Sequence, residues 1–300
     1  MTERTAFFFI AQGEHLTAQA ILLAASLRYH NGAAPDLIAY VPETPDAAPL
    51  PGPARAAFEA LGVAVRPLTV TPGHWKTSYP HGNKLFACAA PRDAVRHVFL
   101  DSDMVCTAPL PVEAVIAPGA VALAPEGTPT WGKTGDGWRR VYDHFGLSLP
   151  TDRVRLTRRR RIAFLPYFNA GMVAFHRDAG AGGRGFADLW CDTARRIDHE
   201  VTVGKKRPWL DQIALPVTLK RFGIPCTVLG DAWNFSISDR AFEADAAPKL
   251  IHYHSFRFGP VWPQFRTERA RMQTTLGAAL MQALTPLYGA HWYRQPEGAA

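Results

Sequence analysis

The sequence has few cysteines and no long apolar run. Its four cysteines among 300 residues show neither the paired spacing of a zinc module nor the density of a disulfide framework. We therefore expect reduced thiols and a cytoplasmic location. No apolar run approaches the roughly 20 residues that a membrane-spanning helix needs. The first apolar stretch, residues 5–11, is too short for a signal peptide and is typical of a strand.

Acidic residues are outnumbered by basic ones. Lys and Arg number 33 against 26 Asp and Glu, which gives a net charge of +7. This balance favours anionic partners such as nucleotides, acidic glycans or anionic lipid. Much of the excess lies in one arginine-rich run, whose simplest interpretation is a solvated loop. No RNA- or DNA-binding motif accompanies the run, so we expect no nucleic acid partner. The run contains Arg153, Arg155, Arg158, Arg159, Arg160 and Arg161.

Strand and helix patterns alternate from the first residues onward. Apolar runs at 5–12, 36–41 and 63–66 predict strands, and helical spacing at 15–30 and 54–61 predicts the helices between them. This alternation is the mark of a parallel, doubly wound sheet. Further helices are predicted at 84–95 (broken near Pro91), 138–145, 186–198, 209–219 (bent at Pro216) and 266–284, and further strands at 98–100, 120–124, 168–175, 226–229 and 249–253. We expect an α/β fold, with a Rossmann-like, mixed but mostly parallel sheet and helices on both faces.

One stretch, residues 97–105 (H-V-F-L-D-S-D-M-V), organises the candidate site. A short buried strand ends in Asp101 and Asp103, and residues two apart on a strand point to one face, about 6.6 Å apart. Open α/β sheets bind their ligands at this end of the strands. Two carboxylates beside phosphates suit a hard divalent cation. The competing interpretation is an ordinary surface turn after a strand.

Two later segments carry polar side chains that suit a binding site. Asn169 opens the strand F-N-A-G-M-V-A-F, where it could bind a hydroxyl group, or where Gly171 could mark a bulge. Asp211 and Gln212 begin a predicted helix. They could face a reacting carbon, or could serve only the first turn of the helix.

A histidine pair and a lysine complete the set of candidates. His252 and His254 end the strand L-I-H-Y-H, and alternation places both on one face. One of them could be the third protein ligand of a metal ion, or the two could be an ordinary hydrogen-bonded pair. A mixed carboxylate and imidazole shell suits Mn²⁺ at least as well as Mg²⁺. Lys84 precedes the D-x-D strand by one helix, and could be a cation near a bound diphosphate or a solvated lysine.

In this order, the motifs resemble those of the retaining nucleotide-sugar glycosyltransferases of family eight, the group that includes glycogenin and bacterial lipopolysaccharide galactosyltransferases. The resemblance spans residues 5–263. It rests on F-F-F-I-A-Q-G-E-H-L from residue 7, N-K-L-F from 83, V-F-L-D-S-D-M-V from 98, F-N-A-G from 168, W-L-D-Q-I-A-L from 209 and I-H-Y-H from 251.

The resemblance implies a GT-A fold and transfer of a hexose, with retention, from a UDP-linked sugar to a glycan, lipid or protein acceptor. It implies a single catalytic domain over residues 1–263, with a nucleotide-binding half at about 1–125 and an acceptor half at about 126–263. A C-terminal helix and tail follow over residues 264–300. Retention would need either a covalent intermediate, with Asp211 as the nucleophile, or attack from the face of the leaving group.

The resemblance also assigns roles to residues. Asp101, Asp103 and His252 (with His254 as the alternative) would bind Mn²⁺ or Mg²⁺, and Asp211, Gln212 and Asn169 would be catalytic. The donor would contact Gln12, Glu14, His15, Lys84, Asp101, Ser102, Asp103 and Arg257. The sequence departs from the family after the histidine: the usual G-x-x-K-P-W is replaced by S-F-R-F-G-P-V-W, in which Arg257 is the nearest cation.

Three other interpretations of the sequence stay open at this point. A haloacid-dehalogenase-like phosphohydrolase would use Asp101 as its nucleophile, and a binding protein would hold a nucleotide sugar without transferring it. A basic, aromatic C-terminal segment could also make a peripheral membrane contact. Its residues are Arg266, Arg269, Arg271, Trp292, Tyr293 and Arg294.

Overall fold

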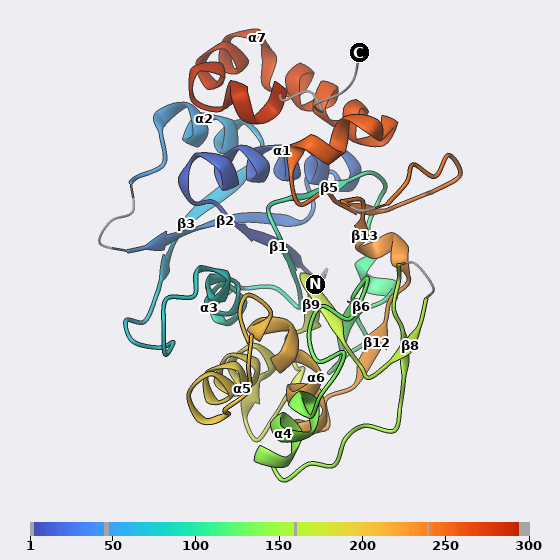
Figure 1. Ribbon diagram of the computed structural model, residues 1–300. Coiled ribbons are helices and arrows are strands. Elements are labelled where there is room, and N and C mark those ends of the chain that lie inside the picture. Colours follow the sequence, from blue (N-terminus) through green and yellow to red (C-terminus); the bar gives the residue numbers. More distant parts are fainter. Residues whose placement is uncertain (1–2, 45–47, 159–160, 239, 294–300) are drawn as a thin grey trace.

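A seven-stranded sheet runs through the centre of the molecule (Figure 1). The computed structural model describes residues 3–44, 48–158, 161–238 and 240–293. The strand order is β12-β6-β9-β4-β1-β2-β3. Only β9 runs antiparallel to its neighbours β4 and β6 among these described strands, so the predicted mixed, mostly parallel sheet is confirmed. The strands are β1 Thr5–Ile10, β2 Asp36–Glu43, β3 Val63–Thr69, β4 Arg96–Leu100, β6 Val121–Pro125, β9 Phe168–His176 and β12 Cys226–Val228.

Helices cover both faces of the sheet (Figure 1). One face carries α1 Gly13–Asn31, α2 Gly52–Ala60 and α7 Pro263–Tyr293, and the other carries α3 Asn83–Ala89, α4 Gly137–His144, α5 Phe186–Glu200 and α6 Leu210–Phe222. The sequence of strand β1 is almost wholly apolar because the strand lies between two hydrophobic cores. Phe7 and Phe9 belong to the core under the first set of helices, and Phe8 belongs to the core under the second. Successive side chains on a strand point to opposite faces, and here both faces are buried.

A second, smaller sheet brings the late part of the chain to the D-x-D segment. It contains β13 Phe235–Ser236, β14 Leu250–His252 and β5 Met104–Cys106. Strand β14 is antiparallel to β5, with His252 opposite Met104. This pairing places His252 beside a segment about 150 residues earlier in the chain. Two short hairpins, β7 Val154–Arg155 with β8 Ala163–Phe164 and β10 Gly180–Ala181 with β11 Arg184–Gly185, lie between the larger elements.

The helix predicted over 84–95 with a break near Pro91 is shorter than expected. It ends at Ala89, because Ala90, which precedes the proline, has an extended backbone with ψ of 138°. The Arg92 guanidinium then donates to the carbonyls of Ala87 and Cys88 at the end of the helix. The arginine run, interpreted as a solvated loop, is exposed at Arg153, Arg155 and Arg161, and of its described arginines Arg155 alone lies in a strand, β7. Its Arg159 and Arg160 lie outside the described residues.

The C-terminal helix packs on α1 and α2. Trp292 is buried, and its indole nitrogen donates to the carbonyl of Ala18. Arg269 donates to the carbonyl of Trp292, and Arg271 pairs with Glu268. Three of the residues considered for a membrane contact, Trp292, Arg269 and Arg271, are therefore bound to other parts of this chain. Arg294 and the side chain of Tyr293 lie outside what the structure describes. Among the described helices, none has the length and apolar character needed to cross a membrane.

Because His97 is buried, we expect the free energy of unfolding of the protein to depend on pH. Burial, reinforced by the nearby Arg92, lowers the pKa of His97 to about 4. As the pH falls from 6.5 towards 4, the unfolded chain takes up a proton that the folded chain refuses, so stability is lost over this window. Between pH 7 and pH 4 we expect wild type to lose about 3 kcal/mol relative to His97→Gln, measured by urea denaturation.

The matched control is His81→Gln, which removes an exposed histidine. Its difference from wild type measures the effect of losing a histidine outside the core. If the difference between His97→Gln and wild type does not exceed this effect between pH 7 and pH 4, the buried ring is not the group that titrates.

Candidate functional site

A cleft of about 480 Å³ opens at the carboxyl ends of the parallel strands β1, β4 and β6. Open α/β sheets bind ligands at this edge. Most of the candidate residues from the sequence line it, although they are spread over more than 240 positions. They are Gln12, Lys84, Asp101, Ser102, Asp103, Asn169, Asp211, Gln212, His252 and His254.

The D-x-D segment is a turn and does not continue the strand. Strand β4 ends at Leu100, and β5 begins at Met104 after a turn in which the Met104 amide donates to the Asp101 carbonyl. The Asp101 amide is bound to Gly171 on β9, and the hydroxyl of Ser102 donates to Ile10 at the end of β1. The two carboxylates therefore converge because a tied turn directs them, and not because of strand alternation.

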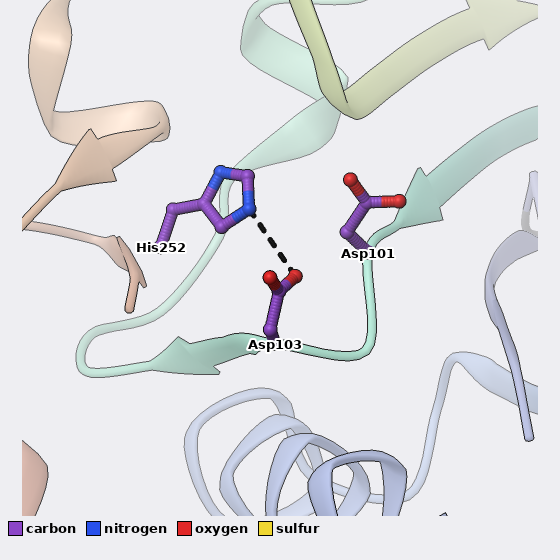
Figure 2. A group of neighbouring side chains, drawn as sticks. All are labelled: Asp101, Asp103 and His252. Atoms are coloured by element: carbon purple, nitrogen blue, oxygen red, sulfur yellow. Dashed lines mark ion pairs between the residues drawn. The ribbon is translucent and has the colours of Figure 1, made fainter. Parts of the chain in front are cut away.

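Asp101, Asp103 and His252 form a group that could hold a metal ion (Figure 2). One ligand atom from each lies within 4.8 Å of the others. The His252 Nε2 atom is 3.2 Å from Asp103 Oδ1, and its Nδ1 lies 2.9 Å from Asn234 Oδ1. An acceptor on Nδ1 holds the proton there and leaves Nε2 as the ligand atom, which is the usual arrangement at metal sites.

Strand β9 passes close to His252, which explains why residue 171 of F-N-A-G is a glycine. A Cβ atom on Gly171 would lie 2.6 Å from His252 Cε1 and 2.8 Å from Asn169 Oδ1. No larger residue fits without moving the ring. His254 has a left-handed backbone with φ of 56°, and its ring stacks on His252 with centroids 3.9 Å apart. His254 also lines the cleft, but it is not part of the group of three.

The charges in this group are strongly coupled. Burial favours the neutral form of the Asp103 carboxyl, but the adjacent His252 outweighs it and holds the pKa of Asp103 well below its usual range. The same contact raises the pKa of His252 against the effect of burial. Burial raises the pKa of Asp101, with a further contribution from Asp103. A divalent cation bound here would relieve the repulsion between the two carboxylates and would compete with the proton on His252.

Lys84 is a buried cation between two carboxylates. Its Nζ atom lies 3.0 Å from Asp101 Oδ1 and 3.1 Å from Asp211 Oδ2, and it also donates to the carbonyl of Ala170. Burial disfavours the charged amine, but the two carboxylates outweigh this effect and raise the pKa of Lys84. The second oxygen of Asp211 accepts a hydrogen bond from Tyr79 at 2.9 Å. Asp211 is 3% exposed and has partners on both oxygens, which does not fit the expectation that it faces a reacting carbon.

A carboxylate that the sequence reasoning missed, Glu126, occupies the cleft. Its Oε2 atom accepts from Gln212 Nε2 at 2.7 Å and from Asn169 Nδ2 at 2.9 Å. Asn234, also missed, joins this group to the metal ligands by donating to Asn169 Oδ1 at 2.7 Å. Glu126 directly follows strand β6, so its position at a strand end was an available signal. Asn234 lies after a short 3₁₀ helix and had none.

Three predicted donor contacts are not among the residues that line this cleft: Glu14, His15 and Arg257. Glu14 and His15 are exposed in the first turn of α1, and the ring of His15 lies 6.1 Å from that of Phe256. The Arg257 guanidinium lies over the ring of Phe258. Gln12 does line the cleft and accepts a hydrogen bond from Asn83 at 3.2 Å.

Comparison with known proteins gives one family match. Residues 7–223 match the family model described as "Rhodobacterales glycosyltransferase domain". No curated protein matches the sequence.

Solved structures of low sequence identity share the fold. The galactosyltransferase LgtC in complex with donor and acceptor sugar analogues has a TM-score of 0.56 and 13% identity, over 97% of this chain and 98% of that one. An active-site mutant of LgtC gives the same values. The bifunctional glycosyltransferase WbbM has a TM-score of 0.57 and 12% identity, over 94% of this chain and 52% of that one. The predicted GT-A-type fold is therefore confirmed.

Proposed function

Since this chain belongs to the Rhodobacterales glycosyltransferase domain family and is thus a glycosyltransferase, we propose that it transfers a hexose from a UDP-linked sugar to a glycan, lipid or protein acceptor, with retention and with the help of a divalent metal. The observation that carries the proposal is the convergence of Asp101, Asp103 and His252 in a cleft that also holds Lys84, Glu126 and Gln212. LgtC, which shares the fold, was solved with donor and acceptor sugar analogues. We extend the resemblance to family eight on the same motifs.

The ligand set fits Mn²⁺, with Mg²⁺ as the second choice. Two carboxylates and one imidazole, with Nδ1 of His252 held by Asn234, offer hard and borderline donor atoms. When bound, such an ion acts as a Lewis acid on the phosphate that leaves. Lys84 would hold the turn and the carboxylate of Asp101 in place for this purpose. Asp211, with Tyr79, would in turn position Lys84.

The donor sugar would face the amides of Asn169 and Gln212 and the carboxylate of Glu126. Fixed hydrogen-bonding groups of this kind orient a sugar hydroxyl without reorganising during the reaction. A covalent route to retention needs a carboxylate at the anomeric carbon. Of the described carboxylates that line the cleft, Glu126 alone is outside the metal group and the Lys84 pair. Attack from the face of the leaving group needs no such carboxylate.

The nucleotide would lie towards β1 and α1. Gln12 at the start of α1 would contact the base or ribose, with Ser102 fixing the turn beneath it; Glu14, His15 and Arg257 would contact the donor only at the rim of the cleft. In this proposal the catalytic unit spans residues 1–263, with its nucleotide half at about 1–125 and its acceptor half at about 126–263. The family match and the fold leave no ground for a phosphohydrolase that uses Asp101 as its nucleophile.

A thermal-shift measurement tests the proposal. UDP together with Mn²⁺ should stabilise the protein, because a ligand that binds only the folded state adds about 2.7 kcal/mol at a concentration of 100 times its Kd. For a chain of this size, such a gain raises the melting temperature by several degrees, roughly 2–4 °C per kcal/mol. The shift should vanish with EDTA.

Mn²⁺ alone and UDP alone are the controls, and each should give a smaller shift than the pair. A set of other nucleoside diphosphates tests the choice of base. If no nucleoside diphosphate stabilises the protein in a metal-dependent way, the proposed donor class is wrong.

A further inference from the structure

The cleft contains a second strong cation that the motifs did not identify. Among the described residues that line the cleft, Lys84 and Arg158 are the two that carry a permanent positive charge. Lys84 is already bound to the carboxylates of Asp101 and Asp211. Arg158 belongs to the arginine run and is the other cation within reach of an anionic ligand in this cleft.

The surrounding structure holds Arg158 in the wall of the cleft. Its amide donates to the carbonyl of Gly127 at 3.0 Å, next to the hydrogen bond from Thr157 to Glu126. Its aliphatic stem lies against Gly127, where a Cβ atom would be 2.5 Å from Arg158 Cδ. Glycine at this position therefore allows the arginine to pass. This close packing distinguishes Arg158 from the exposed arginines of the same run.

The far end of the Arg158 side chain lies beside the small sheet that carries His252. Arg158 Nη1 donates to Ser236 Oγ at 2.9 Å, and Ser236 is the direct neighbour of His252 in the small sheet. Lys84 contacts the same group at Asp101. An anion bound over Asp101, Asp103 and His252 would therefore share the cleft with Lys84, which contacts Asp101, and with Arg158, which contacts the sheet neighbour of His252.

We propose that Arg158 binds the phosphate through which the sugar is attached to the nucleotide, and stabilises it as it leaves. This inference rests on the proposed function. The bond from the anomeric carbon to the phosphate oxygen breaks, and its electron pair stays on that oxygen. The acceptor oxygen forms the new bond to carbon, and its proton passes to the departing phosphate or to water. A guanidinium matches the geometry of phosphate oxygens and remains charged at every working pH.

The test compares a nucleoside diphosphate with a nucleoside monophosphate. Only the diphosphate carries the second phosphate, so Arg158→Gln should weaken UDP binding in the presence of Mn²⁺ by about 10- to 100-fold. UMP binding should change by less than about 3-fold, since it lacks that group. Both affinities are measured by isothermal titration calorimetry on the full chain.

Two further variants make the result specific. Arg155→Gln removes the same charge from the same hairpin, but from an exposed side chain, and should bind UDP as wild type does. Gly127→Ala keeps the charge but displaces the stem of Arg158, and should weaken UDP binding in the same direction as Arg158→Gln. If Arg158→Gln does not fold, Gly127→Ala tests the role of Arg158 in its place.

The outcomes separate the two proposals. Wild type that binds UDP with Mn²⁺, together with an Arg158→Gln variant that binds it equally well, overturns the role of Arg158 and leaves the proposed function standing. An equal loss in Arg155→Gln also overturns it, because the effect is then one of general charge. Wild type that binds no nucleoside diphosphate with metal overturns both.

Discussion

Replacing Asp101 and Asp103 together by asparagine should lower metal-dependent release of UDP from a sugar donor by about 1000-fold, since a bound metal contributes several kcal/mol to the stabilisation of a leaving phosphate and each 1.36 kcal/mol is tenfold in rate. The two carboxylates supply two of the three ligand atoms in the group. Asparagine keeps the size of each side chain and removes its charge. The release of UDP is measured with and without Mn²⁺, in transfer or in donor hydrolysis.

The variant should remain folded. The carboxylates of Asp101 and Asp103 repel each other in the metal-free protein, which contributes to the raised pKa of Asp101. Removal of both charges also ends the contact between Asp103 and His252, and this loss offsets the relief of the repulsion. Lys84 stays paired with Asp211. Loss of activity with an unchanged melting temperature would therefore point to the ligand set, and the affinity for Mn²⁺, measured by calorimetry, should fall in parallel.

A matched control removes two carboxylates from the opposite end of the same strands. Asp93 precedes β4 and Asp178 follows β9, and their side chains are 89% and 73% exposed. Asp93→Asn with Asp178→Asn changes the net charge by the same amount without touching the cleft. If this control loses as much activity, or if the cleft variant keeps its Mn²⁺ dependence, the assignment of the metal ligands is wrong.

The sequence alone was enough to predict the sheet and the edge of the sheet at which the site lies. Alternating strand and helix patterns predicted the parallel part of the sheet, because continuous apolar runs and apolar spacing of period 3.6 are local properties of the sequence. The position of Asp101 at the end of a buried strand then predicted the edge where the cleft lies. The order of short motifs linked it with Asn169, Gln212 and His252, which the structure places in the same cleft.

Other parts of the site depend on contacts that no local pattern records. Glu126 gains its place through hydrogen bonds with Asn169 and Gln212, which are separated from it by 43 and 86 positions. The arginine run looked uniform in sequence, and only the missing side chain of Gly127 allows Arg158 to enter the cleft wall. The convergence of Asp101 and Asp103 was expected for the wrong reason, since a turn tied to Ile10 and Gly171 creates it.

The same contacts show how the cleft is built before any ligand binds. Like charges are brought together at Asp101 and Asp103, and contacts with Lys84 and His252 hold them there. The polar chain from His252 through Asn234 and Asn169 to Glu126 then extends this order into the rest of the cleft. A substitution at Lys84 therefore tests the stability of the fold and the organisation of the cleft together.

Lys84→Met should lower the free energy of unfolding of the metal-free protein by about 3–5 kcal/mol, because loss of one partner leaves a buried charge without compensation. The side chain of Asp211 is 4% exposed and that of Asp101 is 26% exposed, so the larger part of the cost should come from Asp211. Methionine fills the space of the lysine stem without the charge. Urea denaturation in EDTA measures the change.

Adding Asp211→Asn to Lys84→Met should restore part of the lost stability, because the stranded charge is removed and the asparagine oxygen can still accept the hydrogen bond from Tyr79. Lys220→Met, at an exposed position in the last turn of α6, is the matched control and should change stability by less than about 0.5 kcal/mol. Recovery in the double variant would show that Lys84 and Asp211 are coupled in energy as well as in space. Equal loss in the single and double variants would mean instead that the methionine packs badly and that the charge of Lys84 does not stabilise the fold.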